Sequence, residues 1–152
     1  MASVVLGGCG FALRQPPQLP FERLALVGFA PRSPLAAELR RRAGPNVRIV
    51  DHPAQAQVVL QALDDERQRS VVATTGVGQV REFELRARLR FRASTPAGQL
   101  LLPTSELLLT RAMTYNESVA LAKQQEEEEL YRAMEADLVT QVLGRLAALR
   151  MP

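Results

Sequence analysis

Polar and apolar residues alternate without interruption between residues 82 and 93. A period of two is typical of an antiparallel strand with one buried face and one solvated face. Pro96-Ala97-Gly98 then predicts a turn, and residues 99–115 are predicted to return as the hairpin partner, with Pro103 indicating a bulge or an edge. The apolar side of residues 82–93 consists of Phe83, Leu85, Ala87, Leu89, Phe91 and Ala93. The polar side consists of Glu82, Glu84, Arg86, Arg88, Arg90 and Arg92.

Residues 117–149 have the period of an amphipathic helix, with no proline among them. We predict one long helix of roughly 45 to 50 Å, at about 1.5 Å per residue. The acidic run of residues 126–129 is interpreted as a solvated surface of that helix. The apolar residues that recur at spacings of three and four are Leu130, Met134, Leu138, Val142, Leu146 and Leu149.

Four further elements are predicted upstream of this hairpin and helix. Residues 22–29 read as a buried strand, and residues 33–43 as a helix, with a serine cap and a proline at its first position. Residues 46–50 are compatible with a short strand, and residues 57–72 read as a longer strand whose register is unclear. The resulting expectation is an α+β fold, a two-layer sandwich with two helices packed on one face of a mainly antiparallel four-stranded sheet.

The N-terminal residues resemble a bacterial lipoprotein processing site. Leu6-Gly7-Gly8-Cys9 places small residues directly before a cysteine, which is what a signal peptidase accepts. Residues 1–8 are therefore interpreted as a truncated signal remnant, with a thiol at Cys9 to be lipidated. Residues 9–20 are interpreted as a lipid-anchored, Pro-rich tether, and residues 21–152 as a single folded domain. The alternative is a buried cysteine in a small N-terminal strand.

Composition excludes several classes of protein. No run of the 152 residues approaches the roughly 18 apolar residues of a membrane-spanning helix. One cysteine cannot form an internal disulfide, and one histidine with one cysteine does not make a zinc finger. Aromatic residues make up only 5% of the chain and tryptophan is absent, which argues against a surface that stacks nucleic-acid bases.

Charge and motifs give no indication of an enzyme. A Gly-rich phosphate loop, HExxH and G-x-S-x-G are all absent from the sequence. His52 lies between an aspartate and a proline in an expected loop, and the pair Asp64-Asp65 suits a turn better than acid–base catalysis. We therefore expect no catalytic residue, no metal site and no cofactor.

The arginines at residues 86, 88, 90 and 92 are the most distinctive charged feature. On one strand face they would lie about 6.5 to 7 Å apart and repel one another unless compensated. One interpretation is a contact with phosphate or phospholipid, because arginine binds phosphate through paired hydrogen bonds. The other is an ordinary solvated face, with arginine favoured by a GC-rich genome. The net charge of +3 is too small to decide between them.

The order of these motifs resembles the LPS-assembly lipoprotein LptE family over nearly the whole chain after residue 8. The resemblance implies an outer-membrane lipoprotein that faces the periplasm, sits as a plug in the β-barrel LptD, assists its assembly and helps deliver lipopolysaccharide (LPS) to the outer leaflet. It also implies no nucleic-acid partner. The motifs that carry it are Cys9-Gly10-Phe11-Ala12-Leu13-Arg14, Glu82-Phe83-Glu84-Leu85, Met113-Thr114-Tyr115-Asn116 and Ala120-Leu121-Ala122-Lys123.

Basic residues bind LPS in this family, and the resemblance carries one of them over to Lys123 in Leu121-Ala122-Lys123. A second basic position in the family corresponds to Thr74 and Thr75, so Arg81 or the arginines at 86, 88, 90 and 92 are expected to substitute for it. The alternative function is a lipoprotein module that binds another anionic envelope partner. A cytosolic nucleic-acid binder and an enzyme are weaker alternatives.

Overall fold

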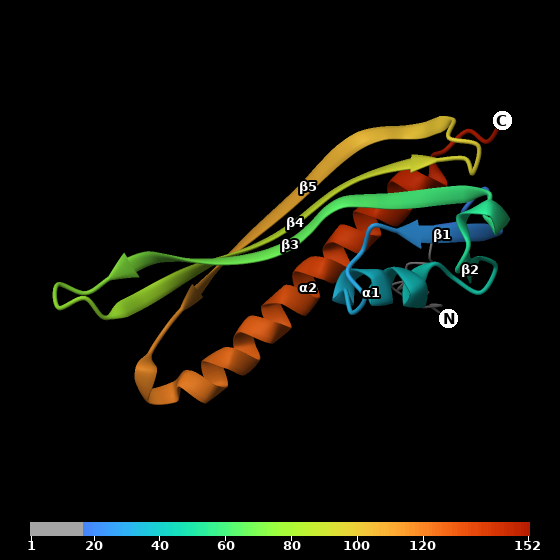
Figure 1. Cartoon of the computed structure of the whole chain (residues 1–152). Helices are drawn as coiled ribbons and strands as arrows, with labels where there is room; N and C mark the ends of the chain where they lie inside the picture. The colour runs from blue at the N-terminus through green and yellow to red at the C-terminus, as the bar shows by residue number, and fades with distance from the viewer. Residues whose placement is uncertain (1–16) are drawn as a thin grey trace, which may run out of the picture.

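The computed structural model describes residues 17–152, which form five strands and two α-helices. The chain first forms a βαβ unit and then a long three-stranded meander, and it ends in a helix that runs back beneath the meander (Figure 1). The elements are β1 (Arg23–Val27), α1 (Pro34–Arg42), β2 (Arg48–Val50), η1 (Pro53–Gln55), β3 (Val58–Thr74), β4 (Val80–Ser94), β5 (Leu100–Thr114), η2 (Glu117–Val119) and α2 (Ala120–Ala147).

The sheet has five strands in the order β2-β1-β3-β4-β5, and it is mixed, so the prediction of a mainly antiparallel four-stranded sheet is wrong. β1 pairs in parallel with both β2 and β3, whereas β3, β4 and β5 pair antiparallel. Two connections account for the difference, one through α1 between β1 and β2 and one through η1 between β2 and β3. Each returns the chain to the same end of the sheet, which makes the following strand parallel to the one before it.

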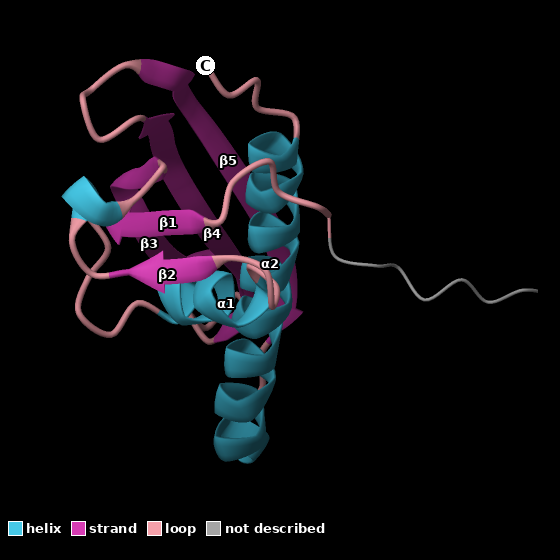
Figure 2. Ribbon diagram, turned by 90° about the vertical axis from the view of Figure 1, so that its right-hand side faces the viewer, coloured by secondary structure: helices cyan, strands magenta, loops and turns pink. Residues whose placement is uncertain are grey.

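Both helices pack on one face of this sheet, as the sequence predicts. α2 runs along the sheet with α1 beside it (Figure 2). The core contains the apolar side of β4, the inner sides of α1 and α2, and parts of the other strands. Its largest fully buried side chains are Phe91, Leu24, Leu35, Leu39, Leu60, Leu85, Leu89, Met113, Met134, Leu138, Leu146 and Val58.

A β-bulge in β3 explains why no clear register could be predicted there. The pairing with β4 shifts between Ala62 and Asp64, so Leu63 is the additional residue. Before the bulge, even-numbered residues such as Ala62 face the helices; after it, odd-numbered residues such as Arg67 do, since Arg67 pairs with the buried Ala87. The bulge therefore turns Asp65, Arg67 and Arg69 toward the helix layer.

The predicted cap of α1, the turn at Pro96-Ala97-Gly98 and the bulge or edge at Pro103 are confirmed. The Ser33 hydroxyl accepts a hydrogen bond from the Ala36 amide at 3.0 Å and donates one to Asp65 at 2.5 Å, so it caps α1 and ties it to β3. The register of β5 is irregular near Pro103, and β5 forms one edge of the sheet.

One end of the molecule is formed only by the β3–β4 hairpin and the start of α2. The tip of the hairpin projects past the end of β5, and the first turns of α2 lie below it (Figure 1). We call this the distal end. Among the described residues, no helix is both long enough and apolar enough to cross a membrane.

Candidate functional site

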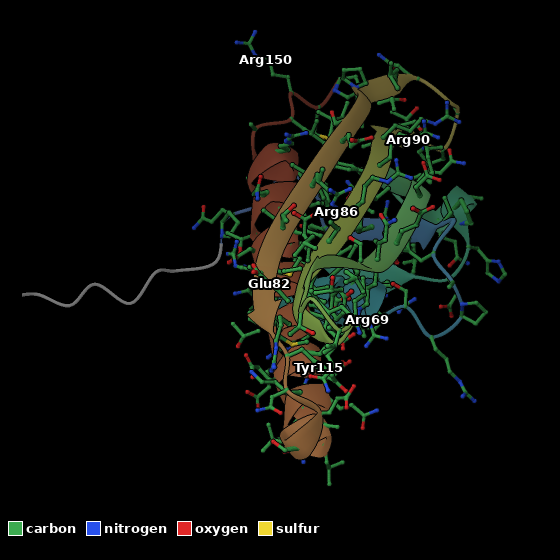
Figure 3. The ribbon with its side chains drawn as sticks, turned by 90° about the vertical axis from the view of Figure 1, so that its left-hand side faces the viewer. Arg69, Glu82, Arg86, Arg90, Tyr115 and Arg150 are labelled. Atoms are coloured by element: carbon green, nitrogen blue, oxygen red, sulfur yellow. The ribbon has the colours of Figure 1, made fainter. Side chains whose placement is uncertain are left out.

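The arginine ladder (Arg86, Arg88, Arg90 and Arg92) lies on the sheet face opposite the helices, as the alternation predicts. The labelled Arg86 and Arg90 follow one another along β4 (Figure 3). Each arginine has a polar partner, mostly from the neighbouring strand β3. The contacts are Arg86 Nε to Glu84 Oε1 at 2.7 Å, Arg88 Nη2 to Glu66 Oε2 at 2.9 Å, Arg90 Nε to Asp64 Oδ2 at 2.7 Å and Arg92 Nε to Gln61 Oε1 at 2.9 Å.

These contacts compensate most of the charge of the ladder within the sheet. Arg88 also lies 3.9 Å from Glu106 on β5, and its hydrogen bond to Glu66 raises the pKa of Arg88 above its ordinary value. A shallow pocket of about 300 Å³ opens beside Arg88 and Arg86. An anion there would compete with carboxylates that already hold the guanidinium groups.

A second group of basic residues, which we call the distal basic cluster, consists of Arg69, Arg81 and Lys123. They belong to the same end of the sheet as the ring pair of Phe83 and Tyr115, whose centroids are 5.1 Å apart in an edge-to-face arrangement. The Arg69 guanidinium lies 4.8 Å from the centroid of Phe83. The Tyr115 amide donates to the Arg81 carbonyl at 2.8 Å.

Lys123 joins this cluster from the first turn of α2. Its Nζ donates to Thr114 Oγ1 at 3.2 Å and to Glu126 Oε2 at 2.7 Å, and its side chain is only 17% exposed. Arg81 is exposed and has no ion-pair partner within residues 17–152. The fold thus brings two of the predicted residues, Lys123 and Arg81, to the distal end. The arginine ladder lies elsewhere, on the sheet face that points away from the helices.

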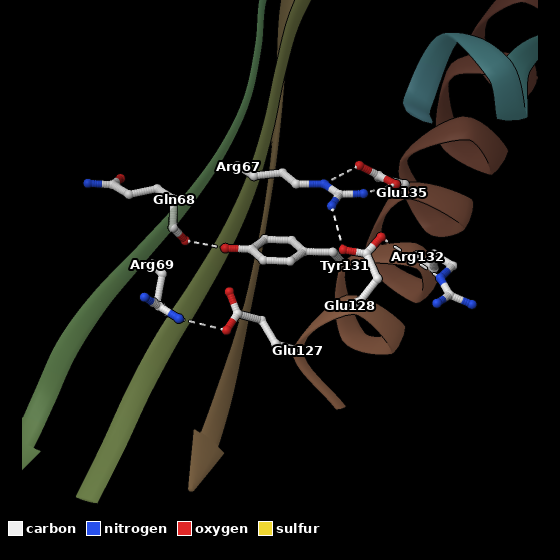
Figure 4. A network of polar contacts seen from close by, with 8 residues as sticks. All are labelled: Arg67, Gln68, Arg69, Glu127, Glu128, Tyr131, Arg132 and Glu135. Atoms are coloured by element: carbon white, nitrogen blue, oxygen red, sulfur yellow. Dashed lines mark hydrogen bonds and ion pairs between the residues drawn. The ribbon is translucent and has the colours of Figure 1, made fainter. Parts of the chain in front are cut away.

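An ionic seam joins β3 to α2 beside this cluster (Figure 4). Arg67 binds Glu135 through two hydrogen bonds of 2.7 and 2.8 Å and also contacts Glu128 at 3.0 Å. The hydrogen bonds to Glu135 raise the pKa of Arg67 above its ordinary value. Arg69 contacts Glu127 at 2.9 Å. These pairs place charge between the helix layer and the sheet.

Tyr131 completes the seam. Its hydroxyl donates to the Gln68 carbonyl at 2.9 Å, and its ring lies 4.8 Å from the Arg67 guanidinium. Burial raises the pKa of Tyr131, so the hydroxyl keeps its proton and remains a donor at neutral pH.

The interpretation of residues 126–129 as a solvated surface holds for the exposed Glu128 and Glu129, but Glu127 is only 20% exposed and pairs with β3, as Glu128 also does. Sequence reasoning also missed Arg67 and Arg69. The signal in the sequence was a pair of arginines on a predicted strand and an acidic run on a predicted helix. Because the strand and the helix had to pack together, these charges could have been expected to pair. The bulge that turns the arginines inward is what concealed it.

Three residues that the sequence analysis considered remain to be placed: His52, Asp64 and Cys9. His52 lies at the start of η1, and Asp64 is held by Arg90. Among residues 17–152, no three His, Cys, Asp or Glu side chains gather as a metal site requires. Cys9, the predicted lipidation site, lies outside the described residues.

Comparison with known proteins gives concordant results. A model of the LptE family, described as lipopolysaccharide-assembly, matches residues 21–146. The chain is 27% identical over 149 residues to the LPS-assembly lipoprotein LptE of Photorhabdus laumondii, covering 96% of this chain and 81% of that protein. The solution structure of an uncharacterized lipoprotein B from Nitrosomonas europaea is similar with a TM-score of 0.74 and 31% identity over 91% of each chain.

The crystal structure of the rare lipoprotein B from Shewanella oneidensis is also similar, with a TM-score of 0.68 and 26% identity over 84% of this chain and 95% of that one. The family match spans every strand and nearly all of α2. The family is one of LPS assembly and not of enzymes. From its sequence and its fold together, the chain belongs to the LptE family.

Proposed function

We propose that this protein is an outer-membrane lipoprotein that takes part in LPS assembly as the partner of an LptD-type β-barrel. The observation that carries the proposal is the family match over residues 21–146. In this proposal Cys9 carries the lipid anchor, residues 9–20 are the tether, and residues 21–152 form the domain that faces the periplasm and the barrel lumen.

The charged sheet face supports a position inside a barrel. The lumen of a large outer-membrane barrel is polar and water-filled, unlike its lipid-facing surface. The arginine ladder with its carboxylate partners gives this domain one broad polar face, which suits contact with polar side chains. The domain would then plug the barrel and assist its assembly without presenting an apolar sheet to water.

The proposed LPS-binding residues are Lys123 and Arg81, with the arginine ladder as a second contact. LPS carries phosphate groups, which lysine and arginine bind through charge-assisted hydrogen bonds. Lys123 and Arg81 lie near each other at the distal end, beside the Thr114-Tyr115 junction. Arg81 is exposed and therefore available to such a ligand.

The function is tested by purifying the tagged, full-length protein from detergent-solubilised outer membranes and identifying the proteins that accompany it by mass spectrometry. We expect an LptD-type barrel in near-stoichiometric amount. Recovery of cell-wall proteins in its place would overturn the barrel assignment and favour the alternative, a lipoprotein module for another anionic envelope partner.

Lys123→Glu is expected to weaken LPS binding about tenfold, the equivalent of losing one strong charge-assisted hydrogen bond. The new carboxylate would also lie beside Glu126 and repel phosphate. The measurement is titration of purified LPS, with circular dichroism to verify the fold. Arg41→Glu makes the same change of charge on the far helix α1, at a side chain that is 74% exposed, and should leave the affinity unchanged. Equal affinities in both variants would remove Lys123 from the site.

Cys9→Ala is expected to abolish acyl labelling, because the thiol is the only group in the chain that can form the thioether to diacylglycerol. The variant should then leave the membrane fraction unless the barrel retains it. Metabolic labelling with a fatty-acid probe, followed by fractionation with and without the barrel, measures both effects. Undiminished labelling would disprove lipidation at Cys9.

A further inference from the structure

The first three turns of α2, residues 120–130, are held on the sheet differently from the rest of the helix. We call them the latch segment. All eight buried residues of α2 lie between Tyr131 and Leu146, and none lies in the latch segment. Hydrophobic burial therefore fixes the second part of α2, and in the first part it is limited to Leu130, which is partly buried against the core.

Polar contacts hold the latch segment in place. Glu127 binds Arg69 at 2.9 Å, Glu128 binds Arg67 at 3.0 Å, and Lys123 binds Thr114 at 3.2 Å. The Arg69 side chain is 50% exposed, so water and ions reach its pair with Glu127. Partly exposed ion pairs are individually weak and are screened by salt.

The surface around the latch segment is apolar as well as basic. Phe83 and the buried Met113 pair across β4 and β5 on the side of the sheet that faces α2. Most of the exposed large apolar side chains of the described chain belong to the distal end. They are Val71, Val72, Val77, Val119 and Leu121. Basic groups beside exposed apolar groups are complementary to an amphiphile with an anionic head.

We propose that a phosphate-bearing amphiphile opens the latch segment by replacing Glu127 at Arg69, and that its apolar part then contacts the sheet around Phe83. This inference rests on the proposed function, which supplies LPS as the amphiphile. Glu127 acts as an internal competitor of the ligand, because it occupies the guanidinium group of Arg69 that a phosphate requires.

Two substitutions in one ion pair are predicted to have opposite effects. Glu127→Gln removes the competitor and leaves Arg69 free, so the apparent Kd for LPS should fall about two- to fivefold. Arg69→Gln removes the group that receives the phosphate, so the Kd should rise by a similar factor. A pair that only stabilised the fold would give effects of the same sign, or none.

The experiment combines LPS titration with hydrogen–deuterium exchange of the full-length protein. Exchange in residues 120–130 should increase with LPS, and also in about 1 M NaCl, where the screening length is about 3 Å. Exchange in residues 131–146 should not change. Glu38→Gln breaks a helix ion pair on α1 and serves as the control. Dephosphorylated LPS and inositol hexakisphosphate separate the contributions of phosphate and acyl chains.

The outcomes separate this inference from the proposed function. If LPS binds but residues 120–130 stay protected, or if Glu127→Gln weakens binding, the latch is overturned and the function stands. If LPS does not bind while salt still opens the latch segment, the LPS assignment fails together with this inference. If inositol hexakisphosphate alone opens it as LPS does, the phosphate exchange stands and the role of the apolar part is overturned.

Discussion

Gly28→Ala is expected to lower the free energy of unfolding by about 4 kcal/mol, through backbone strain and overpacking together. Gly28 has a φ of +80°, a conformation that costs an L-residue energy. A Cβ at this position would lie 2.1 Å from the carbonyl oxygen of Ala62. That carbonyl is backbone at the β3 bulge, so the clash cannot be relieved by rotating a side chain.

Urea denaturation followed by circular dichroism measures this effect. Gly98→Ala is the matched control, because Gly98 has a φ of +90° and nothing within 4 Å of the added Cβ. It should cost only the backbone strain, about 1–2 kcal/mol. Equal losses in the two variants would show that the close approach of Gly28 to the bulge has no energetic weight.

Arg67→Met is expected to lower the free energy of unfolding by about 3 kcal/mol, because it leaves a buried carboxylate without its partner. The Glu135 side chain is 7% exposed and takes both of its hydrogen bonds from Arg67. Methionine fills similar space beside Tyr131 but donates nothing.

The double variant Arg67→Met/Glu135→Leu tests the cause. Replacing both members of a buried pair with apolar residues is often close to neutral, so the double variant should recover most of the loss. Arg41→Met, which breaks an exposed pair on α1, should change stability by less than about 1 kcal/mol. A double variant as unstable as Arg67→Met would mean that packing, and not the unpaired charge, is responsible.

Local patterns in the sequence determined most of the elements of this protein. The strict alternation of residues 82–93 predicted β4 and both of its faces, because side chains of a strand alternate whatever lies beside it. The spacing of Leu130 to Leu146 predicted α2, and Ser33-Pro34 predicted the start of α1. The order of the motifs also indicated the family, which the comparisons confirm.

The site itself was only half determined by the sequence. Lys123 and the alternating arginines of β4 could be found as residues, but their surroundings could not. Lys123 contacts Thr114, and β3 supplies carboxylates to the arginine ladder. Both depend on contacts between different segments of the folded chain. Pairing between such segments leaves no periodic pattern in either one.

Tertiary structure alone decided three further features. β2 is a three-residue strand whose parallel pairing with β1 is possible because α1 returns the chain to the same end of the sheet. The bulge at Leu63 reverses which residues of β3 face the helices, and one residue of shift is invisible in a charged segment without regular alternation. The ionic seam follows from that shift, since Arg67 and Arg69 reach Glu135 and Glu127 only after β3 has turned them toward α2.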